Sequence, residues 1–162
     1  MGLNIIQKVL DDNKDILRVV ELGTGHGGAG LFFGSVISPR GGRSLTIDRT
    51  HLMDGGYEAW KLVAQKYNVE FYNGDVFNDG TIKNVSNFIK DHRALVFCDD
   101  GDKKREVALY AEILKKDDLL MAHDYNDEFS FKDLTEKTLS ILKPYKQELF
   151  SQPTKMLSMM RK

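Results

Sequence analysis

The stretch "VVELGTGHGGAG" (residues 19–30) most constrains what this chain can fold into. It contains five glycines and joins a short apolar run, "ILRVVEL", to a second apolar segment, "AGLFFGSVI". The first run is typical of a buried parallel strand, and the second can form a helix. Glycine accepts positive φ and has no side chain, so the turn between them can bend sharply and let a ligand approach the backbone. Residues 16–37 therefore predict a strand, a ligand-binding turn and a helix.

Strand and helix signals continue to alternate after this unit. Apolar patterns predict strands over residues 43–48, 69–75, 94–100 and 118–124, and helices over residues 55–67, 81–92, 104–116 and 131–143. Apolar residues spaced three and four apart predict a further helix before the first strand, at Leu3, Ile6, Val9 and Leu10. Such alternation is typical of an α/β fold with helices on both faces of a parallel sheet.

The chain finishes with two more strand signals, "YKQELF" (residues 145–150) and "KMLSMM" (residues 155–160). Only "SQPT" separates them, which is too short for a crossover helix, so we expect an antiparallel hairpin at one side of the sheet. The prediction is a single domain over residues 1–162. It is a Rossmann-like three-layer sandwich with a mostly parallel seven-stranded sheet.

Composition narrows the classes of partner. The 162 residues include 23 basic and 24 acidic side chains, for a net charge of −1, so no positive field favours nucleic acid or a membrane surface. Cys98 is the only cysteine, which excludes an internal disulfide and a zinc site built on several thiolates. The first fifteen residues are too polar for a signal peptide, and no apolar run approaches the ~20 residues of a membrane span. We expect a cytoplasmic protein.

Two cofactor patterns overlap in the glycine turn. Gly25, Gly27 and Gly30 spell G-x-G-x-x-G, which is typical of dinucleotide binding. Glu21 and Gly23, together with Gly25 and Gly27, spell E-x-G-x-G-x-G, the pattern of enzymes that bind S-adenosylmethionine. Both cofactor classes need a close approach to the backbone, so the turn by itself does not separate them.

The whole series of strand ends carries more information. Acidic residues follow four successive strands at Glu21, Asp48, Asp75 and Asp99, and this order resembles the class I S-adenosylmethionine-dependent methyltransferases over nearly the whole chain. The segments "VELGTGHGG", "FCDDGDKKREV" and "MAHDY" are most similar to the small-molecule O-methyltransferases grouped with cephalosporin hydroxylase and rhamnosyl O-methyltransferase proteins. A more distant resemblance is to the catechol type.

The resemblance implies a cofactor site at these strand ends. Glu21 would lie near the methionine portion, where a pyrophosphate would be repelled, and Asp48 would bind the ribose hydroxyls. Asp75 would accept from the adenine amino group. The alternative is that Asp48 and Asp75 are turn or helix-cap residues. The full set of implied cofactor residues is Glu21, Gly23, Thr24, Gly25, His26, Gly27, Gly28, Asp48, Arg49, Asp75, Val76 and Asp99.

The segment after the fourth strand bears on the methyl acceptor. It reads "CDDGD" instead of the Asn/Asp-Pro-Pro-aromatic motif of many N-methyltransferases, which argues against an adenine or glutamine acceptor. In the O-methyltransferases that the chain resembles, matching positions hold a divalent metal that binds the acceptor hydroxyl; here they are Asp99, His123 and Asp124. Carboxylates suit Mg²⁺ or Mn²⁺, and a metal lowers the pKa of a bound hydroxyl.

Alternatives remain for this group. Imidazole prefers softer ions than Mg²⁺, so His123 is also a candidate general base. Asn126 is a candidate for a further metal ligand. Asp99 could contact the cofactor without any metal. Asp100 and Asp102 could simply cap the helix that follows. Lys103 is offset by one position from the place where the catechol-type enzymes have their catalytic lysine, and it is a reserve candidate for the base. His26 could border the methionine carboxylate or project to solvent.

The sequence says less about the substrate. Tyr125, Phe129 and Phe131 lie near the expected acceptor side and would suit a ring or sugar face, although the helical phase of Phe131 places it in the core. No lid is inserted, so either the pocket is open to a large substrate such as a glycan end, or a second subunit of a homo-oligomer completes it.

The predicted function is S-adenosylmethionine-dependent methylation of a hydroxyl on a small molecule or glycan, with or without Mg²⁺ or Mn²⁺. The alternatives are a nicotinamide-dependent oxidoreductase and a non-catalytic S-adenosylmethionine-binding protein.

Overall fold

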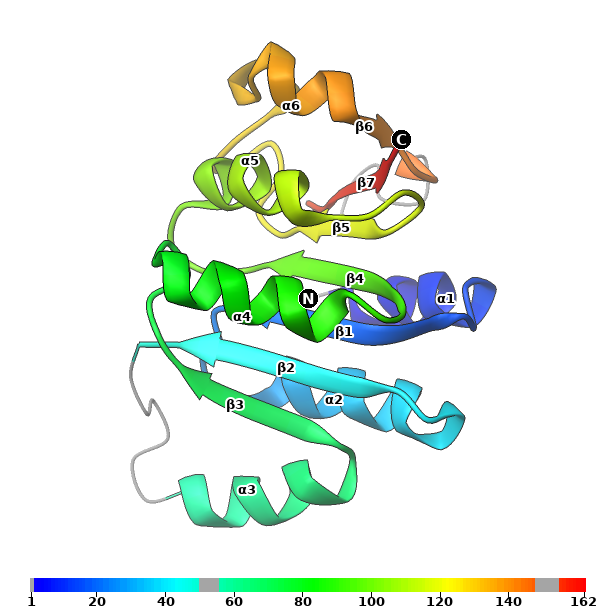
Figure 1. Cartoon of the computed structure of the whole chain (residues 1–162), viewed down its shortest axis with the longest axis vertical. Helices are drawn as coiled ribbons and strands as arrows, with labels where there is room; N and C mark the ends of the chain where they lie inside the picture. Colours follow the sequence, from blue (N-terminus) through cyan, green and yellow to red (C-terminus); the bar gives the residue numbers. More distant parts are fainter. Residues whose placement is uncertain (1, 50–55, 148–154) are drawn as a thin grey trace.

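The computed structural model describes residues 2–49, 56–147 and 155–162. Within these ranges the centre of the molecule is a seven-stranded sheet in the order β3-β2-β1-β4-β5-β7-β6 (Figure 1). Strands β1 to β5 are mutually parallel, and β7 pairs antiparallel with both β5 and β6. The strands are β1 (Ile16–Leu22), β2 (Arg43–Asp48), β3 (Val69–Asn73), β4 (Arg93–Cys98), β5 (Leu119–Ala122), β6 (Leu142–Pro144) and β7 (Leu157–Arg161).

Helices cover both faces of the sheet. The α-helices are α1 (Leu3–Asp12), α2 (Gly28–Ile37), α3 (Tyr57–Lys66), α4 (Asp79–Ile89), α5 (Lys103–Ile113) and α6 (Glu136–Ile141). Phe33 of α2 packs on Phe97 on one face, in the core that α1 also covers. On the other face, α4, α5 and α6 bury a second core that includes Val85 and Tyr110. The predicted three-layer α/β sandwich is confirmed, and none of the described helices is long and apolar enough to cross a membrane.

The C-terminal part differs in detail from the prediction. The expected strand 145–150 lies earlier, at Leu142–Pro144, where Pro144 lacks an N–H with which to continue the ladder. Residues 148–150 lie outside the described residues. Strand β7 inserts between β5 and β6, so β6 runs in the same direction as the parallel strands and β7 alone opposes them.

The predicted helix 131–143 is also interrupted. A 3₁₀ turn covers Phe131–Asp133, and α6 begins only after Thr135. Ser130 and Asp133 form a capping box at the first turn, while the Thr135 hydroxyl accepts from the Thr138 N–H at 3.1 Å at the second. These side chains compete with a continuous helix because each satisfies backbone groups at a local terminus.

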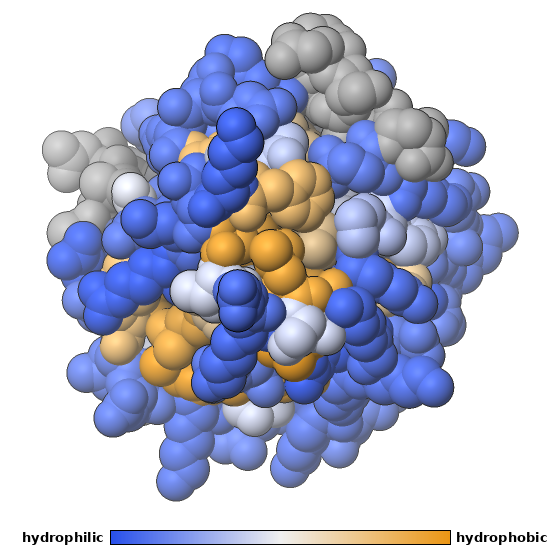
Figure 2. Space-filling view, turned by 90° about the horizontal axis from the view of Figure 1, so that it is seen from above, coloured by the Kyte–Doolittle hydropathy of each residue, from blue (hydrophilic) through white to orange (hydrophobic). Residues whose placement is uncertain are grey.

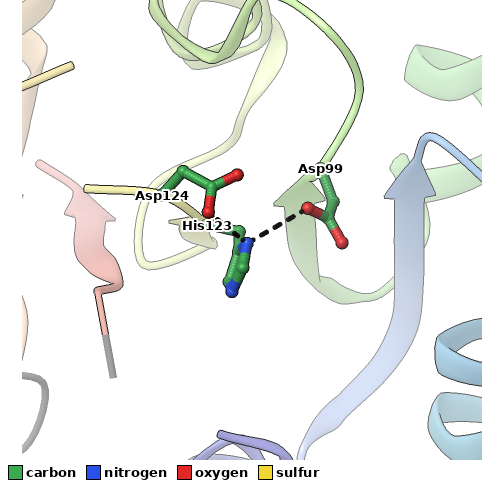
Figure 3. A group of neighbouring side chains, drawn as sticks. All are labelled: Asp99, His123 and Asp124. Carbon is green, nitrogen blue, oxygen red and sulfur yellow. Dashed lines mark ion pairs between the residues drawn. The ribbon is translucent and has the colours of Figure 1, made fainter. Parts of the chain in front are cut away.

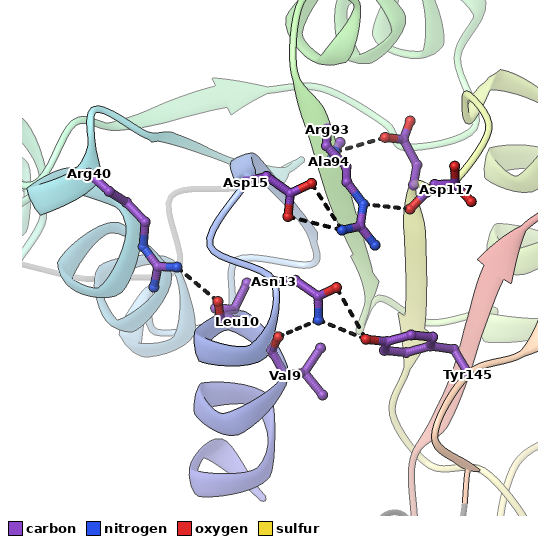
Figure 4. A network of polar contacts seen from close by, with 10 residues as sticks. Val9, Leu10, Asn13, Asp15, Arg40, Arg93, Ala94, Asp117 and Tyr145 are labelled. Atoms are coloured by element: carbon purple, nitrogen blue, oxygen red, sulfur yellow. Dashed lines mark hydrogen bonds and ion pairs between the residues drawn. The ribbon is translucent and has the colours of Figure 1, made fainter.

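The amino-terminal edge of the sheet is closed by a polar network (Figure 4). The Arg93 guanidinium donates to the Asp117 carbonyl at 2.7 Å and to the Asp15 carboxylate at 3.0 Å. Asn13 joins the end of α1 to the Tyr145 hydroxyl at 2.8 Å. A hollow of about 450 Å³ lies at this edge, lined by both acidic and basic side chains. The carboxyl edge, where Leu22 pairs with Ile47 and Cys98, contains the predicted site instead.

Candidate active site

The glycine turn brings the ends of β1 and β4 into contact. Gly23 has φ +92°, and a Cβ atom there would lie 2.5 Å from the backbone oxygen of Asp99. Any other residue would therefore push the two strand ends apart. At Gly25 and Gly28 an added Cβ would meet nothing within 4 Å. These two glycines border open space, which leaves the backbone accessible to a ligand.

A cavity of about 460 Å³ occupies that space at the carboxyl edge of the sheet. Its lining includes four carboxyl groups, those of Glu21, Asp48, Asp99 and Asp100, and no lysine or arginine among the described residues. Most of the cofactor residues expected from the sequence line it. The complete lining is Leu3, Glu21, Gly23, Thr24, Gly25, His26, Gly28, Ala29, Asp48, Asp99 and Asp100.

Glu21 is buried beneath the turn, with 1% of its surface exposed. Its Oε2 accepts from the Thr46 hydroxyl at 2.6 Å, and the Thr46 and Thr24 hydroxyls are 2.7 Å apart. Burial raises the pKa of Glu21 to about 8, although the Thr46 hydrogen bond opposes this. The side chain is therefore mostly protonated at neutral pH in the free protein. A cation entering the cavity would favour its ionised form.

Asp48 organises the turn as well as lining the cavity. Its carboxylate accepts from the Gly25 N–H at 3.3 Å and from the Arg49 N–H at 2.7 Å. Asp75 is not among the lining residues: it accepts from the Phe77 N–H at 2.8 Å and lies 3.8 Å from the Arg49 guanidinium. The turn role weighed for Asp75 is therefore observed, and its contact with adenine stays a prediction.

Val76 and Gly27, also expected at the cofactor site, are not among the residues that line the cavity. The Val76 side chain is buried, and its carbonyl accepts from the Tyr110 hydroxyl at 2.7 Å. The Gly27 carbonyl accepts from Trp60 Nε1 at 3.0 Å. Both residues support the site through the backbone, because their positions are set by contacts with α5 and α3.

The next group lies where β4 and β5 end. Figure 3 shows the His123 ring between Asp99 and Asp124. Nδ1 is 2.9 Å from Asp124 Oδ1 and 3.5 Å from Asp99 Oδ1. Asp124 has φ +57°, a conformation that aspartate tolerates better than most residues. Burial raises the pKa of Asp99 to about 6, against the attraction of His123 and Lys103. The sequence prediction that these three residues meet is confirmed.

Lys103 enters this group from the first turn of α5. Its side chain is only 8% exposed, and Nζ lies 3.2 Å from Asp124 Oδ2 and 3.1 Å from Glu128 Oε2. Burial alone would lower the pKa of Lys103, but the hydrogen bonds to Glu128 and Asp124 raise it above its ordinary value. Burial also acts to raise the pKa of Asp124, yet Lys103 and His123 hold it below its usual range. An ammonium stabilised in this way is unsuited to act as the base proposed for Lys103 in the sequence analysis.

Glu106 is a buried residue that sequence reasoning missed. Its carboxylate accepts from the Asp102 N–H at 3.1 Å and the Asp100 N–H at 3.4 Å, and so holds the loop between β4 and α5. Burial raises the pKa of Glu106 to about 7. Asp102 caps α5 through the Arg105 N–H at 3.1 Å, as the alternative reading expected. The sequence did carry a signal for Glu106, because it is an acidic residue four positions after the helix cap Asp102. Thr46, Trp60 and Glu128 carried no such signal, because only tertiary packing brings them to the site.

The aromatic residues after β5 pack against one another. Tyr125 makes edge contacts with Phe129 and Phe131, with ring centroids 5.6 and 5.5 Å apart. Phe129 is buried in the core, and none of the three lines the cofactor cavity. The backbone at Asn126 has φ +69° and folds the loop back on itself, which pairs Tyr125 with Phe129. These rings therefore build the loop, and contact between any of them and the methyl acceptor stays a prediction.

The donor atoms of Asp99, His123 and Asp124 all lie within 4.8 Å of one another, a spacing compatible with one metal ion. Each Asp124 oxygen, however, already faces a protein donor, Oδ1 to His123 Nδ1 and Oδ2 to Lys103 Nζ. Asn126, the further ligand considered, is exposed and donates its N–H to the Phe129 carbonyl at 2.7 Å. In this arrangement both Asp124 oxygens are already paired, and metal binding by the cluster stays a prediction.

No protein-family model and no curated protein matches the sequence. Solved structures match in fold: CmcI with Mg and S-adenosylmethionine has a TM-score of 0.70 at 16% identity, covering 98% of this chain and 70% of that chain. A Staphylococcus aureus protein assigned as a caffeoyl-CoA O-methyltransferase has a TM-score of 0.64 at 16% identity, covering 99% of this chain and 82% of that chain. The O-methyltransferase TomG from Streptomyces achromogenes, in complex with S-adenosylmethionine, has a TM-score of 0.55 at 15% identity, covering 74% of this chain and 53% of that chain. The chain therefore has the Rossmann-like fold of the class I S-adenosylmethionine-dependent methyltransferases.

Proposed function

We propose that this protein is an S-adenosylmethionine-dependent methyltransferase that acts on a hydroxyl of a small molecule or glycan. The observation that carries the proposal is the acidic lining of the cavity. Among the described residues it has the carboxyl groups of Asp48, Asp99 and Asp100, the buried Glu21 that a bound cation would ionise, and no lysine or arginine. S-adenosylmethionine brings a sulfonium and an ammonium, which such a lining attracts. The pyrophosphate of a nicotinamide dinucleotide would be repelled, so the oxidoreductase alternative is disfavoured.

The cofactor residues have complementary roles in this proposal. Gly25 and Gly28 leave the space that the ligand needs, and Asp48 offers an acceptor for the ribose hydroxyls. Glu21 lies beneath the turn and becomes anionic when the cationic methionine portion is bound. Asp99 lies between the cavity and His123, and so joins the cofactor site to the acceptor side.

His123 is the proposed general base. With Nδ1 donating to Asp124, Nε2 is left as the basic nitrogen, and it points away from both carboxylates (Figure 3). The acceptor hydroxyl transfers its proton to Nε2 as its oxygen attacks the methyl carbon. The carbon–sulfur bond breaks with its electron pair staying on sulfur, and the products are a methyl ether and S-adenosylhomocysteine. Alignment of the three reacting atoms can contribute ~7–11 kcal/mol.

Calorimetry with S-adenosylmethionine, S-adenosylhomocysteine and NAD tests the cofactor. We expect the first two to bind and NAD to show no saturable heat; tighter NAD binding would contradict the proposal. A screen of hydroxyl-bearing metabolites and glycans with methyl-labelled S-adenosylmethionine then tests transfer. Binding without any transfer across the panel would favour the non-catalytic alternative.

A further inference from the structure

The position of Lys103 conflicts with its local environment. It is the first residue of α5, where the helix dipole disfavours a cation. Its side chain is also 8% exposed, and a buried charge is costly unless it is paired. Ordinary helix capping therefore does not account for this lysine, and its partners outside the helix must.

Those partners are the acidic groups that would otherwise attract a metal ion. The ammonium lies 3.2 Å from Asp124 and 3.1 Å from Glu128, and His123 contacts both Asp124 and Asp99 on the other side. A divalent ion bound to Asp124 would have to share that carboxylate with the Lys103 ammonium or displace it. In either case the ammonium would lie beside a second cation in a poorly hydrated position, which is strongly unfavourable.

We propose that the Lys103 ammonium is the resident cation of this cluster, so that the site binds neither Mg²⁺ nor Mn²⁺. Lys103 is then a positioning residue: it holds Asp124, which in turn orients His123. The link to catalysis rests on the proposed function, whereas the exclusion of metal concerns only this chain's own side chains.

Titration with Mn²⁺, followed by electron paramagnetic resonance and calorimetry, tests the inference. We expect the wild-type protein to bind no stoichiometric Mn²⁺ at millimolar concentration. Lys103→Met removes the charge but keeps an unbranched chain, and should gain one Mn²⁺ with at least tenfold higher affinity. Lys103→Arg keeps the charge and should not gain it. Lys104→Met is the matched control on the exposed side of α5.

Two results would overturn the inference. One is stoichiometric Mn²⁺ binding by the wild type that Asp124→Asn abolishes. The other is a Lys103→Met protein that still binds S-adenosylmethionine normally yet gains no Mn²⁺. If Lys103→Met does not fold, the wild-type titration and Lys103→Gln decide the question. S-adenosylmethionine calorimetry on the same samples separates this outcome from a failure of the proposed function, because cofactor binding does not require the cluster to be metal-free.

Discussion

Glu21→Gln should change how stability depends on pH. The folded protein holds Glu21 with a pKa of about 8, against an ordinary value of 4.5, mainly because the carboxyl is buried. Between these values the folded state keeps a proton that the unfolded chain releases. The free energy of unfolding therefore falls as pH rises from about 4.5 to about 8, and levels off above that.

The magnitude follows from the same two values. At about 1.4 kcal/mol per pKa unit, the full difference corresponds to about 5 kcal/mol, and structural relaxation around the charged form reduces it, so we expect about 2–5 kcal/mol. Glutamine cannot ionise and keeps an oxygen that can accept from the Thr46 hydroxyl. The variant should thus gain stability relative to the wild type as pH rises.

Urea denaturation of both proteins at pH 5, 6, 7 and 8 without cofactor measures this difference. Glu106 and Asp99 also have raised pKa values, of about 7 and about 6. Both proteins contain these groups, so the difference between the two pH curves isolates Glu21 together with its interaction with Asp99. Parallel pH curves for the two proteins would refute the assignment of a neutral Glu21. A second readout is proton release on S-adenosylmethionine binding, obtained by calorimetry in buffers of different ionisation enthalpy, which should be present in the wild type and reduced in Glu21→Gln.

Three further predictions concern the cavity and the base. The Gly28→Leu side chain projects into open space, so this substitution should lower S-adenosylmethionine affinity at least tenfold while changing the unfolding free energy by less than about 1 kcal/mol. Gly101→Leu, which also projects into open space, is the control. Equal losses of S-adenosylmethionine affinity in the two variants would contradict a ligand site at Gly28. Asp75→Ala should weaken S-adenosylmethionine binding by about 1.5–3 kcal/mol, and should weaken binding of its inosine analogue, which lacks the adenine amino group, much less. Equal losses of affinity for the two ligands would leave Asp75 with its turn role alone. His123→Gln should lower turnover about 10²–10⁴-fold with cofactor affinity unchanged, as measured with an acceptor found in the screen; undiminished turnover would exclude it as the base.

Local patterns in the sequence were sufficient for the elements and for the edge at which the site lies. The apolar run before Gly23 and the acids at successive strand ends predict parallel strands whose carboxyl ends meet. These predictions hold because their signals are local. Side chains along a strand alternate between the two faces of the sheet, and the helix cap at Asp102 and the turn at Asp75 are hydrogen bonds to neighbours within a few residues. Where two local preferences compete, as at Thr135, sequence periodicity alone predicted one helix and the structure contains two short ones.

The ionisation state of the site and its cations were decided only by tertiary structure. Whether Glu21 carries a charge depends on how completely Thr46 and α2 bury it. Whether Asp124, just after β5, is available to a metal depends on Lys103, which comes from α5. Both are effects of desolvation and of charges a few ångströms apart, and these vary with spatial distance instead of sequence separation. The sequence by itself therefore determined the fold class and the sheet edge of the candidate site, while packing determined which groups are charged and which are already paired.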